Sequence, residues 1–111
     1  MKGKSTIVQS DHLLIAAGRK PNTERLQGEN IGLKFGKDGE VLINNFLETN
    51  ISHIYAAGDV TLSPQFVYVA AHQGGIVGQN VAKQPAKTQN LEYVPAVTFT
   101  TPSIASIGRT E

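Results

Sequence analysis

Two short, continuous apolar runs, each ending at a glycine, constrain the fold of this chain most strongly. The first covers residues 13–17 and ends at Gly18, and the second covers residues 54–57 and ends at Gly58. Unbroken runs of this length are typical of strands that are buried on both faces, as in the parallel sheets of α/β proteins. Pro21 then favours a turn or crossover after the first run. The pattern predicts an α/β fold with buried strands at both runs.

One helix is predicted after the second run. Apolar and small residues recur at intervals of three and four from Phe66 to about Lys83, and Ser63 or Pro64 would begin the helix. Each interior glycine costs about 0.5–1 kcal/mol relative to alanine, so the glycines of this helix indicate close packing against a sheet or a ligand. These glycines are Gly74, Gly75 and Gly78.

Further short elements are predicted on either side. Residues 37–40 resemble a hairpin turn, and residues 40–44 would form the strand that follows it. Extended segments are also expected at residues 6–8 and 94–100.

Composition narrows the classes of function. With 40% hydrophobic residues, 17% charged residues and a net charge of +1, the chain is globular in character and no nucleic-acid-binding polycation. It has no apolar run near the roughly 20 residues that span a bilayer and no signal pattern, so we expect a cytoplasmic protein without a membrane partner. There is no cysteine, which excludes a thiol redox centre on this chain. The histidines are too far apart to predict a metal site: His12, His53 and His72.

The clearest candidate for a functional site is Gly58-Asp59, directly after the second apolar run. Ligands of open α/β sheets bind at the carboxyl ends of strands, where Gly58 would permit close backbone approach and Asp59 would accept hydrogen bonds from hydroxyls. The amides around Phe66, Val67 and Tyr68 would form a positive pole suited to an electron-rich ring. A Gly-Asp pair also occurs in ordinary turns after strands, so the residues alone leave that interpretation open.

Two segments carry a resemblance to a known family. Residues 49–59 resemble the second FAD motif of the pyridine nucleotide-disulfide oxidoreductases, the family of glutathione reductase and dihydrolipoamide dehydrogenase. Residues 14–23 resemble the segment with which that family leaves its NAD(P)H domain, although Ala17 stands where the family usually has threonine.

The resemblance continues along the chain and implies its organisation. Residues 64–71 are similar to the mercuric reductases within the family, and residues 93–102 and 105–108 are similar to the opening strand of its dimerisation domain. The implied fold is an incomplete, Rossmann-like FAD/NAD(P)-binding fragment followed by the first strand of an α+β dimerisation domain. The implied parts are the end of the NAD(P)H-binding domain (1–22), the C-terminal segment of the FAD-binding domain (23–90) and the start of the dimerisation domain (91–111).

Roles for single residues follow from the same resemblance. Asp59 would bind the ribityl chain of FAD, Val67 would contribute a backbone contact to the flavin, and Gly18 would border the nicotinamide nucleotide. Gly58 and the helix start at Phe66 and Tyr68 complete the set of candidate cofactor-binding residues. No residue of this chain is expected to be catalytic.

The resemblance also implies a homodimeric enzyme. In it NADPH reduces FAD, FAD reduces a cysteine pair, and that pair reduces Hg(II) to Hg(0). The cysteines and dinucleotide fingerprints of the family would lie outside these residues, so we expect the isolated chain to be inactive and to self-associate through open strand edges. Two alternatives remain. A dihydrolipoamide dehydrogenase or another disulfide reductase would act on a different substrate, and a free-standing, non-catalytic α/β binding module would have reused the segment.

Overall fold

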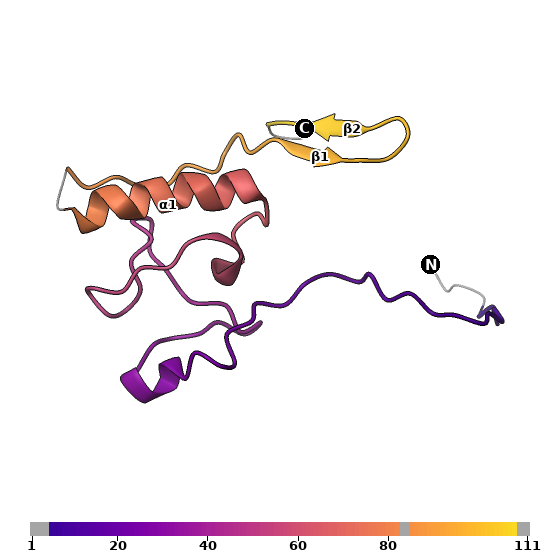
Figure 1. Ribbon diagram of the computed structural model, residues 1–111, viewed down its shortest axis with the longest axis horizontal. Coiled ribbons are helices and arrows are strands. Elements are labelled where there is room, and N and C mark those ends of the chain that lie inside the picture. The colour runs from indigo at the N-terminus through magenta and orange to yellow at the C-terminus, as the bar shows by residue number, and fades with distance from the viewer. Residues whose placement is uncertain (1–4, 83–84, 109–111) are drawn as a thin grey trace.

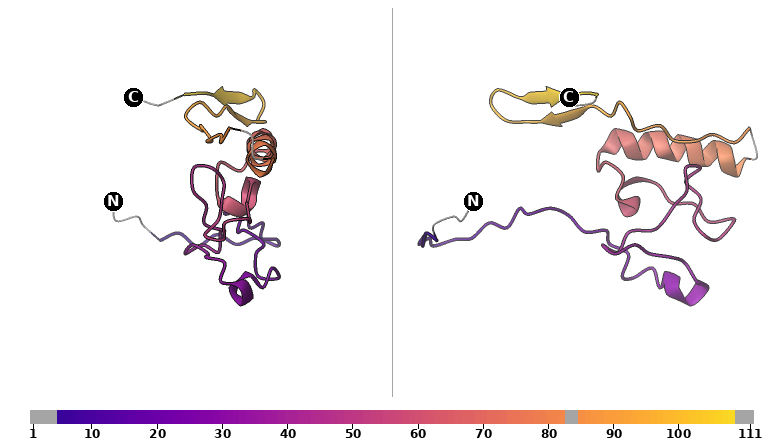
Figure 2. Two further views of the ribbon diagram at one scale, coloured as in Figure 1. Left: turned by 90° about the vertical axis from the view of Figure 1, so that its left-hand side faces the viewer. Right: turned by 180° about the vertical axis from the view of Figure 1, so that it is seen from behind.

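The computed structural model of the chain describes residues 5–82 and 85–108. In chain order, its elements are the 3-10 helices η1 (Gly28–Ile31) and η2 (Gly58–Thr61), the helix α1 (Val67–Val81), and the strands β1 (Ala96–Thr98) and β2 (Ile104–Ser106). The parts that stand out are an extended arm (residues 5–19), a loop-rich body (residues 20–66) on which α1 packs, and the β1-β2 hairpin. The arm and the hairpin both project past the N-terminal end of α1 (Figures 1 and 2).

The projecting parts make the molecule more open than a folded domain of this length. Its radius of gyration is 18.5 Å, whereas about 13 Å is typical of a compact domain of this size. The accessible surface is 9316 Å², against about 6,000 Å² for a compact monomer of this mass. Much apolar surface therefore has no cover from the described residues.

The small core lies between α1 and the body. On α1 the buried residues are Val69, Gln73 and Ile76, spaced four and three apart, so they share one face. This face packs on η2. The body contributes Val41 and Leu47, which are 3% and 0% exposed.

The predicted helix is confirmed, with a different start. Its N-cap is Phe66, in an extended conformation, rather than Ser63 or Pro64. The Ser63 hydroxyl instead lies 2.8 Å from the Thr61 hydroxyl and accepts a hydrogen bond from Gln73. The predicted end at Lys83 lies outside the described residues. No described segment packs closely on the helix glycines, because a Cβ at any of them would have no neighbour within 4 Å: Gly74, Gly75 and Gly78. Of the two expected reasons, only packing against a ligand therefore stays a prediction.

The arm corrects the prediction of a buried strand at residues 13–17. Leu13 and Leu14 are 84% and 88% exposed, and the arm forms no strand. The reason is physical: a strand needs a neighbour for its backbone amides and carbonyls, and no described segment lies alongside the arm (Figure 1).

The runs at 40–44 and 54–57 also fall short of regular strands. Each is reduced to one bridge, Phe35 with Val41 and Glu48 with Tyr55. The predicted hairpin turn is confirmed, since Gly36 donates its amide to the Glu40 carbonyl at 2.8 Å. Neither run becomes a regular strand, because each meets its neighbour in the body at one residue pair and a strand needs a continuous ladder of such pairs.

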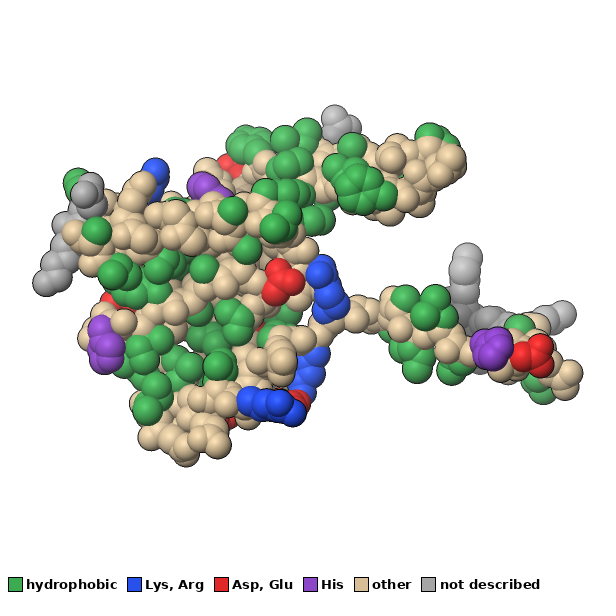
Figure 3. Space-filling model, in the orientation of Figure 1, with side chains coloured by type: hydrophobic (Ala, Val, Ile, Leu, Met, Phe, Trp, Pro, Cys, Tyr) green, Lys and Arg blue, Asp and Glu red, His purple; other side chains and the backbone are tan. Residues whose placement is uncertain are grey.

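The extended segment predicted at 94–100 is confirmed by β1. It pairs antiparallel with β2, with Val97 opposite Ala105. Both strands are exposed or half-buried, and hydrophobic side chains gather over the hairpin in the space-filling view (Figure 3).

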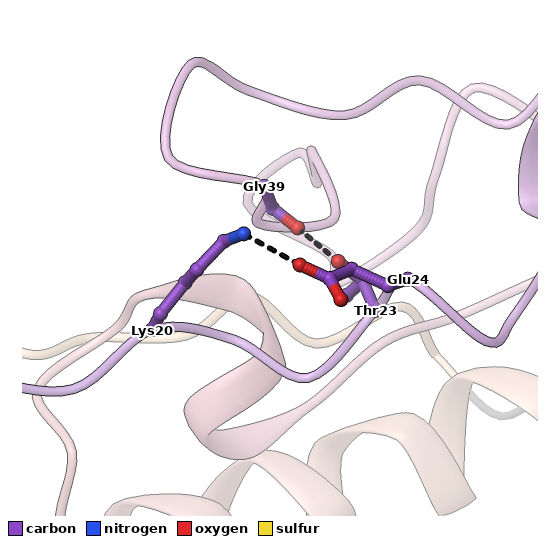
Figure 4. A network of polar contacts seen from close by, with 4 residues as sticks. All are labelled: Lys20, Thr23, Glu24 and Gly39. Atoms are coloured by element: carbon purple, nitrogen blue, oxygen red, sulfur yellow. Dashed lines mark hydrogen bonds and ion pairs between the residues drawn. The ribbon is translucent and has the colours of Figure 1, made fainter.

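Two polar contacts fix the start of the body. The Thr23 hydroxyl donates to the Gly39 carbonyl at 2.6 Å, and Lys20 Nζ donates to Glu24 Oε1 at 2.7 Å (Figure 4). Thr23 is only 7% exposed, whereas both partners of the ion pair are largely exposed. The crossover after the arm is thereby tied to the hairpin turn.

Candidate functional site

The site begins at the sharp turn formed by Gly58. This residue is buried and has a φ of +77°, in the left-handed region that glycine adopts without strain. A Cβ there would lie 3.0 Å from the Cβ of Ala70 in α1. Glycine is therefore required both for the backbone angle and for the contact with the helix. Asp59 follows at the second position of η2, with its side chain 52% exposed.

The start of α1 forms the other half of the site, because α1 packs on η2. Phe66 is the N-cap, and no side chain caps the helix. Among the described residues, the amides of Val67 and Tyr68 have no hydrogen-bond acceptor. The rings of Phe66 and Tyr68 stack with centroids 5.2 Å apart. Free amide donors thus lie beside an aromatic pair.

Arg19 connects the arm to this site. Its Nη1 lies 3.6 Å from Asp59 Oδ2, and its Nη2 donates to the Gln65 carbonyl at 3.0 Å. Both charged side chains are more than half exposed, so water weakens their attraction. They border an open cavity of about 440 Å³. Its lining residues are Arg19, Lys20, Pro21, Asn22, Asp59, Val60 and Gln65.

The structure brings most of the predicted site residues together. Gly58 and Asp59 lie beside the start of α1, where residues 66–68 are found. Gly18 lies at the inner end of the arm, next in sequence to Arg19, and has a φ of +116°.

Gln73, which is fully buried in the middle of α1, is a residue of the site that the sequence did not predict. Its Oε1 accepts a hydrogen bond from the Gly58 amide at 2.6 Å. Its Nε2 donates to Ser63 Oγ at 2.9 Å and to Gln89 Oε1 at 2.7 Å. Its spacing from Val69 places it on the apolar face, and this is the signal that could have found it.

The histidines lie apart from this site's polar contacts. His12, His53 and His72 are all exposed. Within residues 5–82 and 85–108, no group of three His, Asp or Glu side chains could hold a metal ion. In the same ranges, no helix is long and apolar enough to cross a membrane.

Comparison with known proteins identifies the family. A family model described as "Pyridine nucleotide-disulphide oxidoreductase" matches residues 1–74. The chain belongs to this family. A mercuric reductase of Staphylococcus aureus is 54% identical over 111 residues, and a dihydrolipoyl dehydrogenase of Bacillus subtilis (strain 168) is 37% identical over 111 residues.

A solved structure agrees with this family. The HOCl-induced flavoprotein disulfide reductase RclA from Escherichia coli is similar with a TM-score of 0.84 and 34% identity, over 91% of this chain and 23% of that chain. This chain covers 20% of the length of the Staphylococcus aureus relative and 23% of that of the Bacillus subtilis relative.

Membership of the oxidoreductase family confirms the resemblance in the sequence. The α/β fold of an FAD/NAD-binding fragment is supported at the level of the family, and membership implies the use of FAD and a nicotinamide nucleotide. The described residues form only a part of such a fold, with a single α-helix, two short 3-10 helices and one two-stranded sheet.

Proposed function

We propose that this chain is one segment of a larger flavoenzyme that reduces Hg(II) to Hg(0) with NADPH, and that the chain forms part of the FAD site. The substrate is supported by relatives named mercuric reductase, which are 42% to 54% identical to the chain. The dihydrolipoyl dehydrogenase is 37% identical. We refer below to this larger protein as the complete enzyme.

The observation that carries the FAD assignment is the carboxylate of Asp59 beside the uncapped start of α1. FAD has hydroxyls on its ribityl chain, and these can donate hydrogen bonds to a carboxylate. It also has an electron-rich ring end, which the free amides of Val67 and Tyr68 would stabilise. Gly58 allows the close approach of α1 at Ala70, which holds Asp59 beside the helix, and Phe66 adds apolar surface. The donor and acceptor set therefore fits FAD.

The residues of this chain bind and orient rather than react. FAD, when bound, would supply two-electron transfer from the nicotinamide nucleotide to the cysteine pair that reduces Hg(II). Asp59 would hold the ribityl hydroxyls, the amide of Val67 would favour negative charge on the ring, and Gly18 would border the nicotinamide nucleotide. In balance, NADPH and Hg(II) give NADP⁺, a proton and Hg(0).

Three parts of the complete enzyme would meet in this chain. We assign residues 1–22 to the end of the NAD(P)H-binding domain, residues 23–90 to the FAD-binding domain and residues 91–111 to the start of a dimerisation domain. The exposed apolar side chains of the hairpin support a covered position in a homodimer. These include Val97, Phe99, Ile104 and Ile107.

The FAD assignment is tested by replacing Asp59 in the complete enzyme. Asp59→Ala removes a charge-assisted hydrogen bond worth about 1.5–3 kcal/mol, so we expect FAD to bind roughly 10- to 150-fold more weakly. Asp59→Asn should bind FAD better than Asp59→Ala, because the amide oxygen still accepts one hydrogen bond. The measurement is the dissociation constant of FAD from rebinding to the apoprotein.

His53→Ala serves as the control, because His53 is exposed and precedes the second apolar run. It should leave FAD affinity unchanged. If Asp59→Ala folds and holds FAD as tightly as the parent, Gly58-Asp59 is only a turn after a strand.

The substrate is tested separately. The complete enzyme should oxidise NADPH in the presence of Hg(II), and it should not reduce NAD⁺ with dihydrolipoamide. The reverse result would assign the dihydrolipoamide dehydrogenase alternative.

The isolated 111-residue chain should have no activity. It has no cysteine, so it holds no thiolate to pass electrons to Hg(II). Hg(II)-stimulated oxidation of NADPH by the purified chain, with FAD added, would refute this expectation.

The isolated chain should also self-associate. Its arm exposes large apolar side chains, which are Ile7, Val8, Leu13, Leu14 and Ile15 at 79% to 90% exposure. No described segment pairs with their backbone groups, which can therefore accept a strand from a second copy. Light scattering should show a mass that rises with concentration, and Leu14→Lys should reduce the rise. A monomer at high concentration would contradict this expectation.

A further inference from the structure

The amide of Gln73 is the point at which three segments of the chain meet. It contacts the Gly58 turn through Oε1, and the Ser63 loop and Gln89 through Nε2. Gln89 lies beyond the end of α1, and its backbone amide donates to the backbone carbonyl of Asn45 at 3.0 Å. One buried side chain thus ties the segments before, within and after the helix.

The contacts around Gln73 close into a ring. The Gly58 amide donates to Gln73, and Gln73 donates to Ser63. The Thr61 hydroxyl donates to the Gly58 carbonyl at 2.8 Å. Since the single hydroxyl hydrogen of Thr61 is used there, the Ser63 hydroxyl donates in the contact of 2.8 Å between the two hydroxyls. Both backbone polar groups of Gly58 are therefore satisfied from this ring.

This ring fixes the residue directly before Asp59. Gly58 is buried, so its amide without Gln73 would have no partner in the described chain, and that costs free energy. The left-handed φ of Gly58 sets the direction in which Asp59 leaves the turn. A flexible glycine holds that angle only when its neighbours impose it.

We propose that Gln73 is a positioning residue for the FAD site, which holds Gly58 so that the Asp59 carboxylate is aimed at the cofactor. The proposal rests on the proposed role of Asp59. Gln73 itself is buried and does not touch the ligand cavity beside Asp59.

The test compares four variants of the complete enzyme. Gln73→Met is of similar length and removes all three hydrogen bonds, and Gln73→Asn keeps an amide but draws it back by one carbon. Gln73→Glu retains an acceptor for the Gly58 amide. Gln79→Met is the matched control, because Gln79 is an exposed glutamine on the same helix.

Two readouts are measured on each variant. Hydrogen exchange followed by mass spectrometry reports the protection of the peptide over residues 56–60 in the apoprotein, and rebinding gives the FAD dissociation constant. We expect Gln73→Met to lose protection and to bind FAD about tenfold more weakly, the effect of one lost buried hydrogen bond. Gln73→Asn should also lose protection and bind FAD more weakly. It replaces Gln73→Met in the comparison with the parent if Gln73→Met does not fold. Gln73→Glu should keep protection, and Gln79→Met should match the parent.

Two results would overturn the proposal. One is parent-like FAD affinity in both Gln73→Met and Gln73→Asn. The other is weaker FAD binding with unchanged exchange over residues 56–60, since the effect would then bypass Gly58. Asp59→Ala, measured in parallel, separates the two hypotheses. If that variant binds FAD normally, the proposed function fails, and if only the Gln73 variants bind FAD normally, the role of Gln73 alone fails.

Discussion

The apolar run of the arm and the apolar run before η2 share a local sequence but not an environment. Both end in Ala-Ala-Gly followed by a charged residue, which is Arg19 in one and Asp59 in the other. Leu14 of the arm is 88% exposed, whereas Ile54 and Tyr55 of the second run are partly buried. The two charged residues nevertheless meet, 3.6 Å apart.

The difference between the runs lies in their neighbours. In the second run, Ala56 donates its amide to the Leu47 carbonyl at 3.1 Å, and the Ile54 carbonyl accepts from the Thr49 amide at 2.9 Å. The arm has no such partner among the described residues. Apolar character alone therefore creates only the tendency to be buried, and a second segment must supply the backbone contacts and the apolar surface.

The largest contrast is expected from the same leucine substitution in the two regions. Leu47→Ala should reduce the free energy of unfolding by about 2–5 kcal/mol, because Leu47 is fully buried and its removal leaves a cavity. Leu14→Ala in the arm should change it by less than about 0.5 kcal/mol. Urea unfolding of the 111-residue chain at low concentration, followed by far-ultraviolet circular dichroism, measures both. Equal losses would show that the arm packs in solution, and the contrast between the regions would not hold.

Local signals predicted the helix and the hairpin turn, whereas the role of Gly58-Asp59 in binding a cofactor stays a prediction. The helix follows from its spacing, and the turn follows from the glycine chemistry of residues 36–39, both of which are properties of neighbouring residues. The arm was mispredicted because burial depends on a partner that the local sequence does not specify. The place of Gln73 on the apolar face follows from its spacing, but its hydrogen bonds do not, because its partners lie in segments that the local sequence does not bring to it.

A smaller contrast is expected between the two glycines that end the runs. Gly58→Ala introduces strain at a positive φ and a close contact with Ala70, so it should cost about 1–3 kcal/mol. Gly18→Ala should cost less, because a Cβ there meets open space and the unpaired arm can change its angle. Urea unfolding of each variant is the measurement.

The control for both glycines is Gly74→Ala, at a helical position with open space around the added Cβ. It should stabilise the 111-residue chain by about 0.5–1 kcal/mol. A loss of stability from Gly74→Ala would mean that α1 has a close neighbour at this position in solution.

The junction between the arm and the body offers a weaker contrast. Thr23 is buried and donates to the Gly39 carbonyl at 2.6 Å, so Thr23→Val should cost about 0.5–1.5 kcal/mol. The loss should appear in urea unfolding at every salt concentration, because the bond joins neutral groups. If Thr23→Val has no effect, the crossover is held by other contacts than those in Figure 4.

The smallest effect is expected from the ion pair of Lys20 and Glu24. The hydrogen bond between them, together with their opposite charges, lowers the pKa of Glu24 below its ordinary 4.5 and raises the pKa of Lys20 above its ordinary 10.5. A lowered carboxyl pKa stabilises the fold above the ordinary value and loses that contribution as the pH falls through the lowered pKa. A raised lysine pKa stabilises below 10.5 and loses its contribution as the pH rises through the raised value. Because both side chains are largely exposed, Lys20→Met should leave the thermal midpoint at neutral pH almost unchanged. The same variant should return the pKa of Glu24 upward toward 4.5, measured by carboxyl NMR titration at low salt, and added salt should reduce the shift in the parent. A fall in thermal midpoint as large as that of Leu47→Ala would show that this pair, rather than the buried contacts of the body, holds the arm in place.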